Sequence, residues 1–220
     1  MLSPTFVPPR GPIDAKLIVI GEQPGRYEAK LRKPFVGPSG KELSKCLKQA
    51  HVIEPLCYFT NCVKDLERSI DYYANAPSRG KAPKLTEAGL VWRETLREEL
   101  ATLTGSTILA LGNVALFMLT ERWGITRWRG SILDCTLDPR FTVIPAIHPA
   151  TIIPPKGQYK NRWLLINDAE RAWGVATGTY SPVQRSIIPE ATLKETFEFF
   201  DYISENATDE KPAAYDLEVG

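Results

Sequence analysis

Short, continuous apolar runs recur along the first two thirds of the chain, at residues 17–20, 57–60, 107–111 and 141–147. This pattern is typical of strands that are buried on both faces. Helical spacing of apolar residues falls between the runs, at 41–50, 86–103 and 114–120, and in the second of these Trp92, Leu96, Leu100 and Leu103 share one side. The alternation predicts a three-layer α/β/α fold with a central, mainly parallel, four-stranded sheet.

The pattern changes from about residue 176, where prolines punctuate a more polar stretch. A helix is predicted near 190–204, followed by polar residues and the beginning of a new strand. We therefore divide the chain into a domain at 1–175, a linker and helix at 176–212, and the first strand of a further domain at 213–220. An ending on a buried strand is typical of a piece of a longer polypeptide.

Composition and charge exclude some classes of protein. Lys and Arg number 27 against 26 Asp and Glu, so the net charge of +1 excludes a polycation but allows a local basic face. Positive residues do cluster in three loops: Lys30, Arg32 and Lys33, then Arg79, Lys81 and Lys84, then Lys156, Lys160 and Arg162. Each cluster alone is compatible with a solvated surface, and the three together are compatible with a track for a phosphate backbone.

Membrane-span, signal-peptide and cysteine patterns indicate in which compartment a protein is located. No apolar run is long enough for a membrane span, and no signal peptide pattern opens the chain, so we expect a soluble, intracellular, cytoplasmic monomer. The four cysteines, Cys46, Cys57, Cys62 and Cys135, form no Cys-x-x-Cys pair. We expect them to be reduced and structural.

Polar residues follow each predicted strand, in "GEQPG", "TNCVK", "LGN" and "HPATIIPP". The carboxyl ends of parallel strands lie side by side, which predicts a single crevice lined by Glu22, Gln23, Asn61, Asn113 and His148. The glycines at 21–40 have neither the dinucleotide spacing nor the phosphate-loop spacing, because Gly40 and Lys41 precede Glu42 rather than Ser or Thr. A nucleotide-phosphate cradle is therefore excluded.

These segments resemble the uracil-DNA glycosylase superfamily, and most closely its iron–sulfur bacterial and archaeal branch. The resemblance extends over about residues 16–173. It is carried by "GEQPGRYE", "KPFVGPSGKEL", "YFTNCVK", "ILALGNVAL", "WRG" and "IPAIHPATII". It implies a glycosylase-like fold that binds DNA, extrudes a uracil-like base into a pocket and hydrolyses its N-glycosidic bond.

The resemblance also implies roles for individual residues. Phe35 would stack on the base, Asn61 would discriminate uracil from cytosine through its donor and its acceptor, and His148 would donate a hydrogen bond to the departing uracil. Well-known members carry an aspartate where this chain has Gln23. Glu22 and Glu28 are the nearby carboxylates, so we list Glu22, Gln23, Glu28 and His148 as catalytic candidates.

Contacts to DNA are expected from two further segments. After the histidine motif, the family carries an apolar wedge that enters the minor groove, and Ile152 with Ile153 occupies that place. A buried turn is the alternative interpretation of these isoleucines. The other DNA-binding candidates are Ser39, Lys41, Lys156, Lys160 and Arg162.

The cysteines depart from the iron–sulfur branch, which brings four cysteines to its cluster. This chain has no early cysteine pair, Asp65 stands where one ligand would be, and Cys62 is displaced by three residues. We therefore predict no iron–sulfur cluster and no other cofactor for this domain.

The C-terminal "AAYDLEVG" resembles the first motif of the DEDD-type 3′–5′ exonucleases. There Asp216 and Glu218 would help to bind Mg²⁺ or Mn²⁺ in a complete exonuclease or polymerase. An ordinary strand with alternating charge is the other interpretation. The order of the segments is similar to that of phage-type DNA polymerases with a glycosylase-like domain ahead of the exonuclease. This resemblance implies a location in the cytoplasm of a bacterial or phage-infected cell.

Three functions are compatible with these observations. The first is an active glycosylase that is part of a DNA polymerase. The second is a non-catalytic module of a replicative polymerase that senses uracil in the template. This function is favoured by Gln23, which stands where well-known members carry an aspartate. The third is an α/β domain that binds some other nucleobase. DNA is the expected partner in the first two, and no membrane is expected in any.

Overall fold

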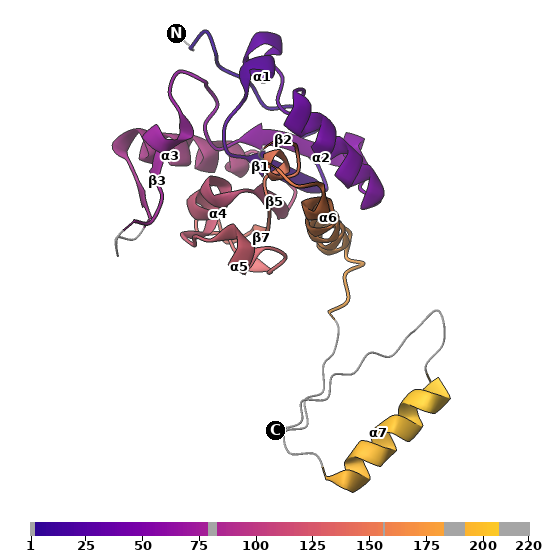
Figure 1. The fold of residues 1–220 in the computed structure, drawn as a ribbon. Coiled ribbons are helices and arrows are strands. Elements are labelled where there is room, and N and C mark those ends of the chain that lie inside the picture. The colour runs from indigo at the N-terminus through magenta and orange to yellow at the C-terminus, as the bar shows by residue number, and fades with distance from the viewer. Residues whose placement is uncertain (1–2, 79–82, 156, 183–191, 207–220) are drawn as a thin grey trace. The chain divides into compact units, whose positions relative to one another are not determined.

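The computed structural model describes residues 3–78, 83–155, 157–182 and 192–206. Contacts divide the chain into two units, Met1–Ser181 and Pro182–Gly220, and each unit is described by itself. The first holds an open sheet with helices on both of its faces (Figure 1).

The sheet has the strand order β2-β1-β5-β7-β6. Four strands are mutually parallel: β1 (Leu17–Gly21), β2 (Cys57–Asn61), β5 (Thr107–Leu111) and β7 (Thr142–Ala146). The mainly parallel sheet is thus confirmed. The predicted number of four strands is wrong, because β6 (Leu133–Asp134) adds an antiparallel edge strand beside β7. With two residues, β6 is too short to give a periodic signal.

Helices cover the two faces of the sheet. On one face α2 (Pro38–Gln49) packs beside α6 (Arg162–Thr177), and on the other lie α3 (Glu87–Ala101) and α4 (Asn113–Thr120) (Figure 1). The sequence pattern predicted three of these four helices. It missed α6, whose core-facing residues Leu165, Ile166, Ala169 and Ala172 are interleaved with polar ones and include two small alanines. Such a stripe gives a weak helical period.

Shorter elements connect the main ones. The first unit also contains the helices α1 (Arg26–Leu31) and α5 (Ile125–Trp128), the hairpin of β3 (Ala74–Asn75) and β4 (Lys84–Leu85), and the 3-10 turns η1 (Glu54–Leu56), η2 (Ile70–Tyr72), η3 (Pro149–Thr151) and η4 (Tyr159–Asn161). Alternate residues of the strands face opposite cores: Ile18 and Ile20 face α3 and α4, whereas Leu17 and Val19 face α2 and α6.

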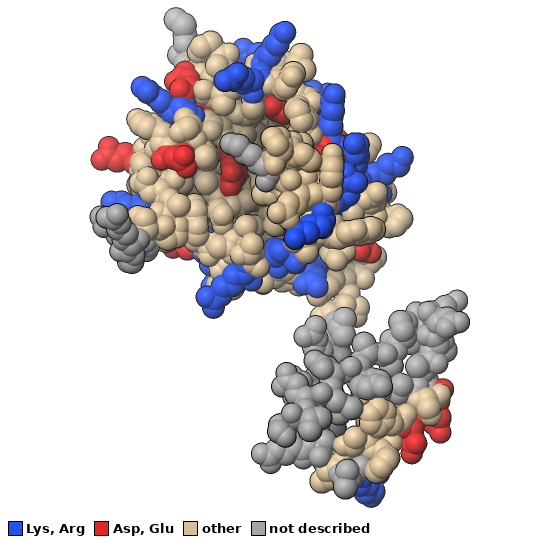
Figure 2. All heavy atoms as spheres, viewed as in Figure 1, with Lys and Arg blue, Asp and Glu red and all other residues tan. Residues whose placement is uncertain are grey.

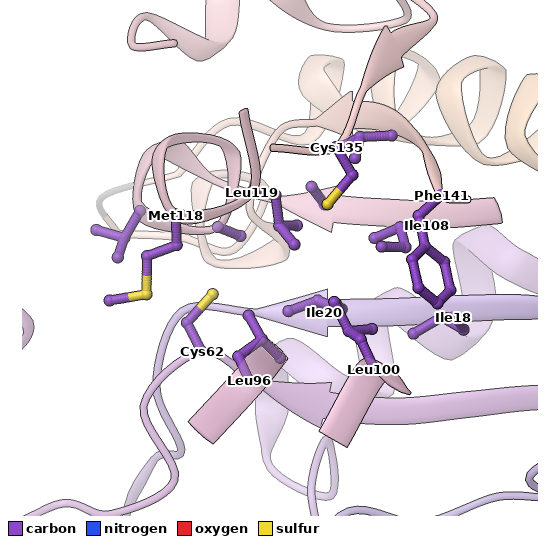
Figure 3. Packing of buried hydrophobic residues seen from close by; sticks show 14 of the residues in the cluster. Ile18, Ile20, Cys62, Leu96, Leu100, Ile108, Met118, Leu119, Cys135 and Phe141 are labelled. Atoms are coloured by element: carbon purple, nitrogen blue, oxygen red, sulfur yellow. The ribbon is translucent and has the colours of Figure 1, made fainter. Parts of the chain in front are cut away.

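The four cysteines are buried and unpaired by disulfides. Cys62 and Cys135 belong to the core beneath α3 and α4, where both lie among apolar side chains (Figure 3). Cys46 and Cys57 belong to the opposite core. Burial raises the pKa of Cys46 to about 11 and that of Cys57 to about 12, so these thiols remain protonated at neutral pH. The four sulfurs therefore lie on two different faces of the sheet.

A buried ion pair holds the segment that follows β2. Lys64 Nζ lies 2.5 Å from Glu99 Oε2 and donates to Thr60 Oγ1 and to the backbone oxygen of Asn61, at 3.1 and 2.9 Å. Tyr58 donates its hydroxyl to the other oxygen of Glu99 at 3.0 Å. Breaking such a buried network leaves an uncompensated charge, so it is expected to hold the end of β2 in one position.

The second unit contains α7 (Leu193–Asn206), which corresponds to the helix predicted near 190–204. The predicted strand at 213–220, with Asp216 and Glu218, lies outside the described residues. Within the described part of the chain, no helix is long and apolar enough to cross a membrane.

Candidate active site

A cavity of about 300 Å³ opens at the carboxyl edge of the sheet. It is lined by residues that follow three of the parallel strands: Glu22 to Glu28, Phe35 and Gly37 to Gly40 after β1, Asn61 and Ile70 at the end of β2 and beyond, and His148 after β7. This is the place where open α/β sheets bind ligands. The structure thus brings Glu22, Gln23, Asn61 and His148 together, as expected from the strand ends.

Glu28 holds the loop that forms one wall of the cavity. Its carboxylate accepts hydrogen bonds from the backbone N–H groups of Gly25, Val36 and Gly37, at 3.1, 3.0 and 2.7 Å. The side chain is buried, and three backbone donors occupy most of its accepting capacity. This geometry makes Glu28 an anchor between the two halves of the loop. Its predicted catalytic role remains a prediction.

Phe35 stands in the cavity wall in a conformation that its surroundings impose. Its backbone has a φ of 56°, in the left-handed region, and its ring packs edge-on against Phe59 with centroids 5.9 Å apart. Two glycines make room for it. A Cβ on Gly40 would overlap the Phe35 backbone, and a Cβ on Gly21 would lie 2.8 Å from Cζ of the ring. The glycines of this loop therefore serve the placement of an aromatic ring.

Asn61 is the last residue of β2, and its side chain is 5% exposed. Its amide lies against Gly21, where a Cβ would overlap Oδ1 of Asn61. Among the described residues, no side chain or backbone group forms a hydrogen bond with this amide. The described residues hold no fully buried side-chain N or O atom without a hydrogen-bond partner, so this amide is open to the cavity. It therefore offers one donor and one acceptor direction to a molecule in the cavity.

Gln23 and Glu22 are each partly engaged by the fold. The Gln23 amide nitrogen donates to the backbone oxygens of Asp65 and Arg68, at 2.9 and 2.6 Å, and so ties the loop after β1 to the loop after β2. Glu22 Oε1 accepts from the backbone N–H of Val114 at 3.0 Å, in the first turn of α4. This contact satisfies a backbone N–H group that has no partner within the helix. No hydrogen bond to Glu22 Oε2 occurs within the described residues.

His148 follows β7 and lines the cavity with a defined protonation pattern. Its Nδ1 accepts a hydrogen bond from the backbone N–H of Ala150 at 3.2 Å, so the proton of the neutral ring lies on Nε2. Burial lowers the pKa of His148 below its ordinary value, against the opposing effect of the Glu22 and Glu28 carboxylates. At neutral pH the ring is therefore uncharged and carries an Nε2–H donor.

Asn113 does not belong to the cavity, and its expected place in the crevice is wrong. Its Oδ1 accepts from the backbone N–H groups of Gly124 and Ile125, at 3.2 and 2.8 Å, and so caps the start of α5. The side chain is engaged within the fold because the chain returns to it after α4. The segment that returns to Asn113 lies outside the strand-end motif, so the motif could not predict this contact.

The wedge prediction is wrong for Ile152, which is 0% exposed and packs in the core beside α2 and α6. The turn after His148 folds back onto the sheet, and burial of this side chain stabilises it there. Ile153 is half-buried. The alternative interpretation of a buried turn therefore describes Ile152.

The other predicted DNA contacts differ in their surroundings. Ser39 lines the cavity, and Lys41 and Lys160 are exposed. Arg162 is partly engaged, because its guanidinium lies 2.6 Å from a carboxylate oxygen of the buried Glu42. Lys156 lies outside the described residues.

Sequence reasoning missed several residues that line the cavity, among them the large side chains of Arg26, Tyr27 and Ile70. Arg26 and Tyr27 lie in the first turn of α1, and both are exposed. Their position within "GEQPGRYE" was a usable signal, since they follow the strand-end motif directly. Ile70 is brought in by a long loop after β2, and its sequence position carries no such signal.

The described residues hold no group of three or more His, Cys, Asp or Glu side chains placed to bind a metal ion. At the position discussed for a cluster ligand, Asp65 is buried and accepts from the Tyr73 hydroxyl at 2.9 Å and from the backbone N–H of Glu67 at 3.3 Å. Both contacts are structural. The absence of a cofactor remains a prediction.

Comparison with known proteins agrees with the fold and with the motifs at the cavity. Residues 8–169, most of the chain, match the model of the uracil DNA glycosylase superfamily, and the chain belongs to this superfamily. It is similar to the type-4 uracil-DNA glycosylase of Thermotoga maritima, with 27% identity over 74% of this chain and 78% of the relative. It is similar to the type-4 uracil-DNA glycosylase of Archaeoglobus fulgidus, with 28% identity over 67% and 72%.

A third relative is a protein of another kind, a DNA polymerase. The DNA polymerase of Bacillus phage SP01 is 25% identical over 86% of this chain, and the match covers 19% of the polymerase. The resemblance to the glycosylase superfamily is thus confirmed. The exonuclease motif at Asp216 and Glu218 stays a prediction.

Proposed function

We propose that this chain binds DNA, takes an extruded uracil or a closely related pyrimidine into the cavity, and hydrolyses its N-glycosidic bond. The observation that carries the proposal is the amide of Asn61, which is nearly buried and lacks a protein partner in the described structure. It shares a cavity of about 300 Å³ with an aromatic ring and an imidazole. A small cavity with a few converging polar groups suits a single base.

Recognition of the base follows from Phe35 and Asn61. A base taken out of a duplex loses its stacking, and the Phe35 ring replaces part of that contact. The edge of uracil presents a donor N–H beside an acceptor carbonyl, and the amide of Asn61 complements both. Cytosine presents the opposite order of a ring acceptor beside an amine donor. In the observed orientation, with Oδ1 beside Gly21, the amide favours uracil.

His148 acts on the departing base. When the bond between the sugar C1′ and the base nitrogen breaks, the bonding electrons go to uracil and negative charge develops on its carbonyl oxygens. The neutral imidazole donates its Nε2–H toward that charge. A donor placed before the reaction stabilises the transition state more than the ground state.

The positive charge that develops on the sugar is balanced by carboxylates. Glu22 and Glu28 lie close enough to His148 to oppose the lowering of its pKa. Glu28 is occupied by three backbone donors, whereas Glu22 has one oxygen without a hydrogen bond among the described residues. We assign to Glu22 the orientation of the water that adds to C1′. That water loses one proton as the abasic sugar forms, and the departing uracil anion takes up one proton, so the hydrolysis is balanced.

A second function is supported by Gln23 and by the phage polymerase relative. An amide is a poor base, and the nitrogen of Gln23 is engaged by two backbone oxygens. If Glu22 does not orient a water, the chain retains a uracil pocket without hydrolysis. It would then sense uracil in a template strand as a module of a polymerase, which is the context of the relative matched over 19% of its length.

One experiment separates these functions. The purified chain is incubated in excess with oligonucleotides that contain a single uracil or, as a control, thymine, in single-stranded and duplex form. Released uracil and alkali-labile sites are measured together with the binding affinity. Asn61→Ala is compared with Asn167→Ala, which removes an exposed amide from the surface of α6.

The glycosylase proposal expects uracil release by the parent chain and by Asn167→Ala, and none by Asn61→Ala. The sensing function expects no release, but tighter binding to the uracil strand than to the thymine strand, with the difference lost in Asn61→Ala. Equal binding to both strands without release would contradict both functions.

A further inference from the structure

Positive charge is distributed unevenly along the chain. Residues 1–181 contain 24 Lys and Arg against 17 Asp and Glu, whereas residues 182–220 contain 3 against 9. The net charge of +1 is therefore the sum of a basic first unit and an acidic second unit. On the face shown in Figure 2, blue side chains gather over the side of this unit where α2 lies in Figure 1.

The exposed side of α2 carries a row of three lysines. Lys41, Lys45 and Lys48 follow one another at four and three residues, which places them on one side of the helix. All three are exposed, and they line a groove between α2 and the segment after it, together with Ser44, His51, Val52 and Glu54. The groove has a volume of about 670 Å³.

The acidic groups near this row are already paired. Glu54 lies 3.1 Å from Arg10 and accepts the Ser44 hydroxyl at 2.6 Å. Glu42 is buried against Arg162 and is 3.9 Å from Lys45. Lys41 and Lys48 have no ion pair within the described residues. At Lys41 and Lys48 the row therefore presents positive charge that no carboxylate of the described residues pairs with, whereas Lys45 shares Glu42 with Arg162.

The row begins beside the candidate active site. Pro38, Ser39 and Gly40, in the first turn of α2, line the cavity, and Lys41 follows them directly. From Lys41 to Lys48 the helix rises by roughly 10 Å, at 1.5 Å per residue. Along the axis of B-form DNA, about three phosphates of one strand occupy that length. The lysine row thus begins one residue after the cavity lining and has a length suited to a few nucleotides.

We propose that the lysine row of α2, formed by Lys41, Lys45 and Lys48, binds the phosphate backbone of the DNA strand that leaves the cavity. This inference rests on the proposed binding of an extruded nucleotide and assigns the path of its flanking strand. The contacts are to phosphates, so they carry no sequence information. They fix the register of the strand so that a nucleotide at the cavity mouth stays there.

The test compares two variants of equal charge in the full chain. Lys45→Gln/Lys48→Gln removes two lysines of the row and leaves Lys41 beside the cavity. Arg122→Gln/Arg127→Gln removes two charges from the surface around Trp128, to which both guanidinium groups lie close. Affinity for thymine-containing and uracil-containing strands is measured as a function of salt, with melting temperatures as the check on folding.

Each lost phosphate contact reduces the salt dependence of binding by a known amount. For Lys45→Gln/Lys48→Gln, the slope of log affinity against log salt should fall by about 1.4 on single strands and about 1.8 on duplex DNA. For Arg122→Gln/Arg127→Gln it should stay at the parental value. Equal slopes in all three proteins, or equal losses in both variants, would overturn the proposal.

Shortened strands locate the contact. The uracil strand is truncated in steps on its 5′ side or on its 3′ side. Truncation on one side should remove the difference between Lys45→Gln/Lys48→Gln and the parent, and truncation on the other should leave it. A difference that is independent of both truncations would contradict a path along α2.

The slope on thymine-containing strands does not depend on base removal. If uracil is neither released nor preferred but the slopes differ as expected, the lysine row stands and the proposed function fails. If uracil is released and the slopes are equal, the function stands and the lysine row fails.

Discussion

The ends of β2 and β5 both place an asparagine at the same edge of the sheet, and the two side chains have opposite surroundings. Asn61 is nearly buried at the cavity and has no hydrogen-bond partner among the described residues. Asn113 caps α5 through two backbone N–H groups. A polar group whose bonds are satisfied by the fold stabilises the fold, whereas a polar group that faces a cavity without protein partners is available to a ligand.

The same contrast separates the carboxylates and extends to the histidine. Glu28 is surrounded by three backbone donors, while Glu22 retains an oxygen without a partner in the described structure. His148 has one nitrogen engaged by Ala150 and the other available as a donor. The groups with remaining hydrogen-bonding capacity are those that we assign to recognition and chemistry.

The largest effect on base removal is expected from Asn61→Asp. A carboxylate only accepts hydrogen bonds, so it no longer complements the uracil carbonyl and better suits the amine of cytosine. Uracil release should fall by roughly 10⁴-fold, the scale at which unmatched polar groups are rejected. Release of cytosine from a matching oligonucleotide should become measurable.

Asn113→Asp is the matched control for this change. The aspartate oxygens can still accept hydrogen bonds from the backbone N–H groups of Gly124 and Ile125, so the cap and the uracil activity should be retained. Similar losses in the two variants would show that the contrast between the strand ends has no functional meaning.

His148→Ala removes the available Nε2–H donor of the histidine. Loss of one donor to a developing negative charge typically reduces kcat by about 10²-fold to 10³-fold. Because the bond strengthens in the transition state, KM should change little. Steady-state kinetics on a single-stranded substrate measure both. A raised KM with an unchanged kcat would assign His148 to binding alone.

The neighbouring isoleucines 152 and 153 provide a second contrast, between buried and half-buried side chains. Ile152→Ala should lower the free energy of unfolding by roughly 2 to 5 kcal/mol. At a permissive temperature, the ratio of its activities on duplex and single-stranded uracil substrates should equal that of the parent chain. Ile153→Ala should leave stability nearly unchanged. If Ile153 is the wedge, this variant loses activity on the duplex substrate only.

Denaturant unfolding and the ratio of duplex to single-strand rates check both variants. An Ile152→Ala protein of parental stability would contradict the burial of this side chain. If the ratio of duplex to single-strand rates is unchanged in both variants, neither isoleucine acts as a wedge.

The smallest effect concerns pH. Burial lowers the pKa of His148 below its ordinary value of about 6.5, so the neutral ring persists at pH 6.5 and protonates only in more acidic solution. The kcat profile should be flat from neutral pH through 6.5 and fall below it. Since the unfolded chain takes up the proton first, stability should decline as pH drops below about 6.5.

The matched measurement is the same pair of profiles for His148→Ala, from which the contribution of the histidine to both profiles should be missing. A midpoint above pH 6.5 in the parent profile would contradict the neutral ring.

The sequence by itself determined the parallel strands, three of the main helices and four polar residues of the cavity. Continuous apolar runs report burial on both faces, and strand ends in a parallel sheet must meet at one edge. The resemblance carried by the ordered motifs was sufficient for the superfamily. These features depend on short stretches of sequence and on rules that hold for every α/β sheet.

Only the tertiary structure decided which of those polar residues are engaged. Asn113 and Ile152 were misplaced because their surroundings come from segments distant in sequence: the return of the chain to α5 in one case, and the cores of α2 and α6 in the other. Burial and hydrogen-bond partners are properties of several segments at once. A strand-end motif can therefore predict that a side chain reaches an edge, but the partners it finds there depend on how the rest of the chain packs.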